Sequence, residues 1–153
     1  MTAERVDRAS GDLGAPVLQH ATCIAYAGRG VLLMGEPGTG KSSLALRLID
    51  RGAMLVADDY ALLTREGDSL VATVPETIAG LIEVRGSGIF RLPYRRRAEI
   101  ALTVRLGRED ERLPEPKEWE MLGLARPLLV MDALRDDSPL KVEMALSGGP
   151  IRL

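Results

Sequence analysis

A glycine-rich segment at residues 35–42 has the residue types and the spacing that bind phosphate. It reads GEPGTGKS and satisfies the pattern G-x-x-x-x-G-K-[ST]. Glycines let the backbone turn tightly and bring its N–H groups against phosphate oxygens. In such loops the lysine reaches the β- and γ-phosphates and the serine hydroxyl ligates Mg²⁺. The sequence therefore predicts a nucleotide phosphate loop formed by Gly35, Glu36, Pro37, Gly38, Thr39, Gly40, Lys41 and Ser42.

Two adjacent aspartates, Asp58 and Asp59, follow a short apolar segment at residues 53–57. The short connection from the loop predicts that this segment is a strand next to the strand at residues 31–34, with its carboxyl end beside the phosphate loop. One carboxylate could hold Mg²⁺ there while its neighbour points the other way, because adjacent strand residues alternate sides. The alternative is two solvated aspartates at a strand end.

Other polar groups are open to both a structural and a functional interpretation. His20 is the only histidine, and a single histidine in an apolar strand is more often packed than catalytic. Glu83 and Arg85 flank Val84, so they share one face of an expected strand, as a surface ion pair or as a metal and phosphate pair. The arginines at residues 95–97 form either a solvated stretch or a docking patch for an acidic partner.

Composition narrows the class of protein. The 153 residues suffice for one ordinary domain. With 20 Lys and Arg against 22 Asp and Glu, the net charge of −2 gives no argument for binding nucleic acid or a membrane surface. Hydrophobic residues make up 46% and aromatic residues 3%, which predicts an aliphatic core. One Cys and one His exclude an internal disulfide and a structural zinc site. No signal core or apolar span is visible, so we expect a cytoplasmic protein.

The elements that must position these groups are mostly strands. Residues 1–16 are polar and are expected to form a flexible N-terminal arm, followed by a single domain over residues 17–153. We expect a surface loop at residues 107–118, and a second helix with Ser138 as its N-cap. The fold class is α/β, a strand-rich sheet with few helices. The expected strands are 17–27, 31–34, 53–57, 60–64, 69–74, 98–106 and 127–131, with two extended pieces within 81–93 and helices at 42–51 and 138–146.

Three strings together resemble the catalytic domain of bacterial HPr kinase/phosphorylase. They read HATCIAYAGRGVLLMG, GEPGTGKSSLALRLIDRGAMLVADD and LIEVRGSGIFRLP, and they span most of residues 17–92. Similarity is weaker over residues 127–146. The resemblance implies a P-loop kinase domain of the HPr kinase/PEP carboxykinase type. It implies an enzyme that uses ATP and Mg²⁺ to phosphorylate a regulatory serine of the phosphocarrier protein HPr, and that assembles as a hexamer.

The resemblance also implies roles for individual residues. Asp59 corresponds to the aspartate that accepts the proton of the serine hydroxyl. Arg112, in the string ERLPEP, is matched to a later catalytic arginine across a shorter intervening segment. The catalytic residues so implied are His20, Lys41, Asp59, Arg85 and Arg112. The metal ligands are Ser42 and Glu83, with Asp58 as the strand-end carboxylate expected to hold Mg²⁺.

Two departures from the family bear on function. The sequence resembles a short alphaproteobacterial form of the family, for which no long N-terminal domain is expected before the phosphate loop. A late segment of PGRN type is replaced by RDDSP at residues 135–139, which leaves reversal of the reaction by phosphorolysis open. Two further functions also stay open: a nucleotide-dependent regulatory binding module that transfers no phosphate, and a kinase of a small molecule.

Overall fold

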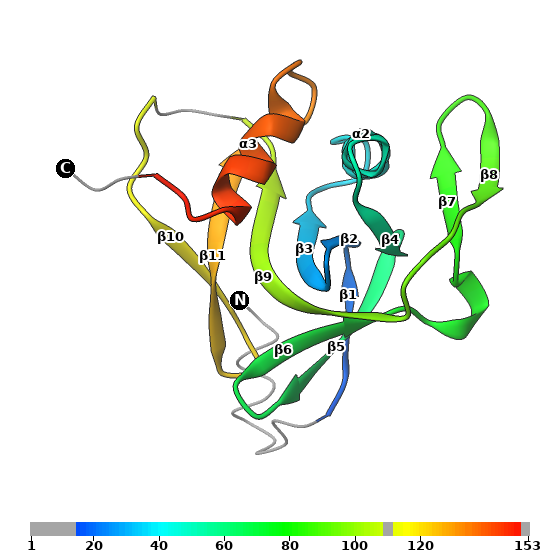
Figure 1. Cartoon of the computed structure of the whole chain (residues 1–153), viewed down its shortest axis with the longest axis horizontal. Helices are drawn as coiled ribbons and strands as arrows, with labels where there is room; N and C mark the ends of the chain where they lie inside the picture. The colour runs from blue at the N-terminus through cyan, green and yellow to red at the C-terminus, as the bar shows by residue number, and fades with distance from the viewer. Residues whose placement is uncertain (1–14, 109–111, 151–153) are drawn as a thin grey trace.

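The computed structural model describes residues 15–108 and 112–150. Within these ranges a nine-stranded sheet carries two helices, and a separate two-stranded hairpin stands to one side (Figure 1). The elements in chain order are β1 (Val17–His20), β2 (Thr22–Tyr26), β3 (Arg29–Met34), α2 (Lys41–Asp50), β4 (Met54–Ala57), β5 (Tyr60–Glu66), β6 (Ser69–Thr73), a 3₁₀ turn (Glu76–Ile78), β7 (Leu81–Val84), β8 (Gly88–Arg91), β9 (Arg97–Leu106), β10 (Lys117–Met121), β11 (Leu124–Met131) and α3 (Ser138–Leu146).

The long strand β9 is the centre of the sheet. Its first residues pair with β6, and its later residues pair in parallel with β3 and β11. The main order of strands is β1-β5-β6-β9-β3-β2-β4. Opposite Gly30 and Val31 the partner in β9 jumps from Ile100 to Leu102, a bulge at Ala101. The bulge turns the later part of β9 over, so the two halves of this strand bury their side chains on opposite faces of the sheet.

Both faces of the sheet are buried. In β3, Val31 and Leu33 pack with the apolar side chains of α2 and α3, whereas Leu32 and Met34 pack on the other face with β5, β6 and β10. This explains the run of apolar residues without alternation, because each successive side chain enters one of two cores. The expected buried strand at residues 31–34 is confirmed.

The prediction of a single strand at residues 17–27 is wrong. The chain bends at Ala21, so β1 pairs with β5 while β2 pairs with β3 and β4. The adjacency of the strands at residues 31–34 and 53–57 is also wrong, because β2 lies between β3 and β4. Since β2 runs antiparallel to both neighbours, β3 and β4 still point the same way. Their carboxyl ends therefore meet at one edge, as the sequence predicted.

Two expectations near the C-terminus also need correction. The end of the expected loop at residues 107–118 is strand β10, whose buried Trp119 and Met121 alternate with exposed charged residues, and which turns directly into β11. The helix α3 is present, but Ser138 does not cap it: Asp137 occupies the N-cap position, and the Ser138 hydroxyl donates to the carbonyl of Asp132. Residues 1–14 of the expected N-terminal arm lie outside the described residues.

Candidate functional site

Residues 35–40 connect β3 to α2, which begins with Lys41 and Ser42, at the edge where the carboxyl ends of β3 and β4 meet. Gly40 is the N-cap of α2 and has a φ of 95°, a left-handed conformation that suits glycine. The Nζ of Lys41 donates to the carbonyl oxygens of Gly35 at 2.8 Å and Glu36 at 3.3 Å. Lys41 is 8% exposed, so its ammonium is held against the loop backbone at the start of the helix.

Asp58 is a buried carboxylate that joins four elements. Its Oδ1 accepts hydrogen bonds from the Ser42 hydroxyl at 2.7 Å and the Thr22 hydroxyl at 3.0 Å. Its Oδ2 accepts the backbone N–H of Glu83 at 3.0 Å. The residue is only 6% exposed. Charged hydrogen bonds of this kind offset the cost of burying a carboxylate, and here they fix α2, β2 and β7 relative to the end of β4.

Asp59 has the opposite character, because its side chain is 64% exposed. Its backbone has a φ of 72°, in the left-handed region. Its Oδ1 lies 2.9 Å from Nε2 of His20 at the end of β1. The Tyr60 ring contacts the imidazole of His20, with the two ring centroids 5.1 Å apart. The two aspartates therefore have separate partners, one inside the fold and one at its surface.

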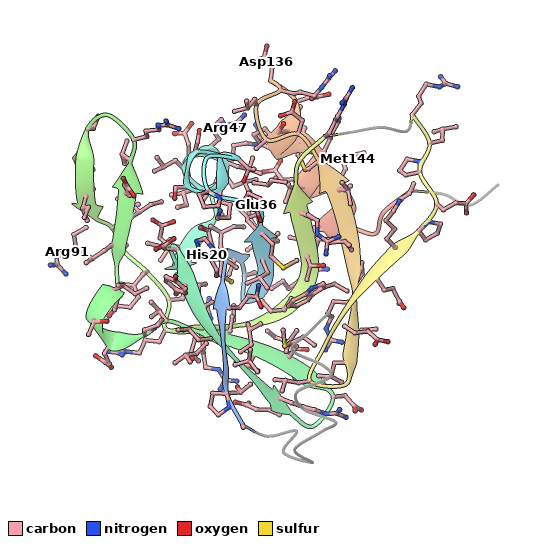
Figure 2. The ribbon with its side chains drawn as sticks, turned by 180° about the vertical axis from the view of Figure 1, so that it is seen from behind. His20, Glu36, Arg47, Arg91, Asp136 and Met144 are labelled. Atoms are coloured by element: carbon pink, nitrogen blue, oxygen red, sulfur yellow. The ribbon has the colours of Figure 1, made fainter. Side chains whose placement is uncertain are left out.

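The exposed groups line one cleft of about 620 Å³ between the phosphate loop and the β7–β8 hairpin. His20, Asp59 and the loop approach it from the sheet edge, and Figure 2 shows His20 and Glu36 both on the side of the sheet nearest α2. The lining residues are His20, Thr22, Pro37, Gly38, Gly40, Lys41, Ser42, Ser43, Leu46, Asp59, Glu83, Val84 and Arg85.

Most of the residues expected from sequence meet at this cleft. Asp58 lies beneath it, bonded to the lining residue Ser42. Gly35, Glu36 and Thr39 belong to the loop but are not among the lining residues. Arg112 lies apart from the cleft, exposed in the segment between β9 and β10. Arg85 follows the end of β7 and reaches the lining from the turn of the hairpin.

The oxygen atoms at the base of the cleft suit a hard cation. The Ser42 hydroxyl and the Asp58 carboxylate are in contact, and Glu83 lines the same cleft. Mg²⁺ prefers such oxygen ligands and commonly takes only one or two carboxylates from the protein, with phosphate or water completing its shell. No group of three or more His, Cys, Asp and Glu side chains is arranged for a metal in the described ranges. The donor set therefore fits a cation that is shared with phosphate.

Sequence reasoning missed Thr22 and Tyr60, which contact Asp58 and His20, and the lining residues Ser43, Leu46 and Val84. Thr22 is fully buried, and its hydroxyl donates to Asp58. A threonine in the otherwise apolar string ATCIAYA was the available signal, because a buried hydroxyl needs a hydrogen-bond partner. Tyr60 lies next to Asp59 in sequence, but its contact with His20 depends on the pairing of β1 with β5.

Comparison with known proteins decides the family. The chain matches the HPr Serine kinase C-terminal domain over residues 12–127. It belongs to this family. Similar proteins named HPr kinase/phosphorylase include one from Caldicellulosiruptor bescii, 37% identical over 134 residues, and one from Cupriavidus necator, 40% identical over 121 residues. These matches cover 78% and 71% of this chain but 43% and 38% of the relatives, so the chain spans less than half of their length.

A similar solved structure supports the assignment to the HPr Serine kinase C-terminal domain family. The HPr(Ser) kinase/phosphatase from Coxiella burnetii superimposes with a TM-score of 0.75 at 28% identity, over 86% of this chain and 88% of that chain. The match confirms the strand-rich α/β fold with few helices. Membership of a kinase family implies the use of a nucleotide. No helix in the described ranges has both the length and the apolar character needed to cross a membrane.

Proposed function

We propose that this protein is an ATP- and Mg²⁺-dependent kinase that phosphorylates a serine of HPr. The observation that carries the proposal is one cleft that holds both the phosphate loop, with Lys41 and Ser42, and the Asp59 carboxylate bonded to His20. A phosphoryl donor and a proton acceptor are thus brought to one place, which is what transfer to a hydroxyl requires. The relatives named HPr kinase/phosphorylase support HPr as the acceptor.

The loop side of the cleft would bind the triphosphate of ATP. Backbone N–H groups at the start of α2 point out of the helix and carry its positive end, which favours phosphate. The ammonium of Lys41, already held beside the loop, would neutralise charge that develops on the transferred group. Arg85 approaches from the hairpin and adds a second positive charge on the opposite side of the cleft.

Ser42, Glu83 and Asp58 would hold Mg²⁺ beside the terminal phosphates. When bound, Mg²⁺ supplies positive charge that offsets the charge of the phosphate oxygens. Asp58 would also orient the Ser42 hydroxyl, to which it is bonded at 2.7 Å. Proton transfer would be carried out by the side chain of Asp59, positioned by His20.

Asp59 would accept the proton of the attacking serine hydroxyl, for which the two oxygens must come within about 3 Å. His20 contacts Oδ1 of Asp59 at 2.9 Å and would keep the carboxylate turned toward the cleft. We assign proton acceptance to the second oxygen, Oδ2. In the reverse direction the same carboxylate would take a proton from inorganic phosphate as the phosphate attacks phosphoserine. It would return that proton to the serine oxygen as the O–P bond breaks, so that serine and pyrophosphate leave. Arg112 is given no step, because it does not line the cleft.

The direct test is mass spectrometry of HPr after incubation with the purified protein and Mg·ATP. The proposal expects a single added phosphate on a serine, and loss of that phosphate when inorganic phosphate replaces ATP. A Lys41→Ala variant serves as the control for activity that does not come from this cleft. Binding of HPr that depends on nucleotide, with no phosphoserine formed, would replace the proposal with a regulatory binding module. Turnover of a small hydroxyl compound, with none of HPr, would also refute it.

The family resemblance further supports assembly of several copies, which we include in the proposal as a homo-oligomer. Edge strands such as β1 and β10 leave backbone groups that another copy could cover. Sedimentation velocity of the purified chain at several concentrations tests this part separately, and a monomer at all concentrations would contradict it.

A further inference from the structure

The β7–β8 hairpin projects from the body of the protein as a sheet of its own (Figure 1). Its attachment is on β7, where Ile82 is buried against the core beside α2 and the N–H of Glu83 is bonded to Asp58. Strand β8 is exposed along its whole length. Two large apolar side chains lie on it, Ile89 at 71% exposure and Phe90 at 46%. Such exposure is unusual for a short hairpin, which gains its stability by burying apolar surface.

The register of the hairpin connects this exposed surface to the cleft. Ile89 lies directly opposite Glu83, and Arg91 lies directly opposite Leu81. Side chains at directly opposite positions share one face of a sheet, so Ile89 and Arg91 extend the face that carries Glu83. Glu83, Val84 and Arg85 all line the cleft. Because Val84 lies on the face opposite to that of Glu83, residues on both faces of the hairpin border the cleft. Phe90 lies on the other face, opposite Ile82.

The charge on the hairpin is also left without an internal partner. Among the described residues neither Arg85 nor Arg91 has an ion pair with a carboxylate, and Figure 2 shows Arg91 pointing away from the body. Nearby Arg96 and Arg97 differ, because they pair with Glu76 and Glu66. The hairpin that borders the cleft therefore offers two exposed apolar side chains, Ile89 and Phe90, beside guanidinium groups that have no ion pair among the described residues.

We propose that the β7–β8 hairpin is the docking arm for the protein substrate, which contacts Ile89, Phe90 and Arg91 when its hydroxyl reaches Asp59. The inference rests on the proposed function and adds to it the surface that recognises the acceptor. A stable protein contact buries about 800 Å² on each partner, and the exposed residues of β8 would add to the contact made at the cleft. The hairpin lines the cleft through Glu83, Val84 and Arg85. It fits a partner that presents apolar side chains and carboxylates around the acceptor hydroxyl.

The test is titration of HPr into the full chain, with nucleotide affinity measured in parallel. We expect Ile89→Ser to weaken HPr binding about tenfold and Ile89→Leu to restore it, since loss of one buried anchor commonly has at least this effect. Arg91→Glu should also weaken HPr binding, with the larger loss at low salt. Affinity for ATP should be the same in all variants. The matched control is Met144→Ser on α3, where the methionine is 70% exposed and remote in sequence from the hairpin.

The outcomes separate this inference from the proposed function. Equal affinity of the wild-type chain, Ile89→Ser and Arg91→Glu for HPr overturns the docking arm, even if phosphoserine is formed. Wild-type binding of HPr too weak to detect also overturns it. If HPr binds and the hairpin variants weaken binding, but no phosphoserine appears, the docking arm stands and the kinase proposal fails. A loss in Met144→Ser as large as that in Ile89→Ser counts against the hairpin as the specific surface.

Discussion

The two walls of the cleft are built differently. The wall formed by the phosphate loop and α2 rests on the core: Lys41 is buried, and the helix packs through Leu44 and Leu48. The opposite wall is the β7–β8 hairpin, attached chiefly through Ile82 and the bond from Glu83 to Asp58. The difference indicates that the phosphate-binding wall is held rigidly by the fold, whereas the wall that would meet the acceptor depends on a few contacts.

The largest effect is expected on the loop wall. Lys41→Ala removes the ammonium that lies against the carbonyls of Gly35 and Glu36. Loss of one charge-stabilising donor commonly lowers kcat by about 100- to 1,000-fold. The rate of phosphoserine formation at saturating ATP measures this, with Lys117→Ala on the distant strand β10 as a matched control. A loss below about tenfold would show that the loop wall is not where charge develops.

The anchor of the hairpin wall should matter next. Ile82 is 1% exposed, and truncating a buried isoleucine to alanine commonly costs about 2–5 kcal/mol. Because the hairpin is a separate sheet, we expect Ile82→Ala to open it before the rest unfolds. Hydrogen exchange of the β7 and β8 amides should become faster, while amides of β3 and β9 stay protected. Equally faster exchange throughout the chain would mean that the two walls form one cooperative unit.

Asp58 connects the two walls of the cleft through its hydrogen bonds, and Asp58→Asn tests how much these hydrogen bonds contribute to stability. An amide accepts through one oxygen only, so either the hydroxyls of Ser42 and Thr22 or the N–H of Glu83 loses its acceptor. A buried hydrogen bond to a charged group is worth about 1.5–3 kcal/mol. We therefore expect urea unfolding to show a loss of about that size. An unchanged midpoint would show that the carboxylate contributes no net stability.

The smallest effect is expected at a contact away from the cleft. There Arg51, at the end of α2, donates hydrogen bonds from two of its nitrogens to the carboxylate of Glu143 on α3. Hydrogen bonds from Arg51 hold the pKa of Glu143 below its ordinary value of 4.5. A lowered folded pKa means that the contribution to stability is present above 4.5 and is lost as the pH falls through the folded pKa. The difference in Tm between wild type and Glu143→Gln should be constant near neutral pH and shrink below pH 4.5. A difference that grew on acidification would contradict this sign.

Local patterns in the sequence were enough to predict the structure of the phosphate loop and of the helix that follows it. The string around Lys41 and Ser42 predicts both the turn and the following helix, because apolar residues at helical spacing continue it. The strand-end carboxylates could be placed at the right edge even though β2 separates β3 from β4. The structure adds that the Ser42 hydroxyl contacts Asp58 at that edge.

Pairings between strands that are distant in the chain could not be predicted from the sequence. The bend at Ala21, which sends β1 to β5 and brings His20 to Asp59, leaves no local signal. Strand β10 was hidden because its exposed positions are charged and only Trp119 and Met121 enter the core. That Ile89 is exposed while Ile82 is buried depends on which face of the hairpin meets the body, a property of packing and not of either residue.

The central claim is that Asp59 takes the proton of a serine hydroxyl while ATP lies on the loop that contains Lys41. Asp59→Asn tests it most directly, since the side chain is exposed and its replacement should leave the fold intact. The measurement is the single-turnover rate of phosphoserine formation on HPr, with ATP affinity determined by calorimetry on the same sample. The account predicts unchanged ATP affinity and a rate lowered by about 100-fold or more. A rate equal to that of the wild-type protein would contradict it.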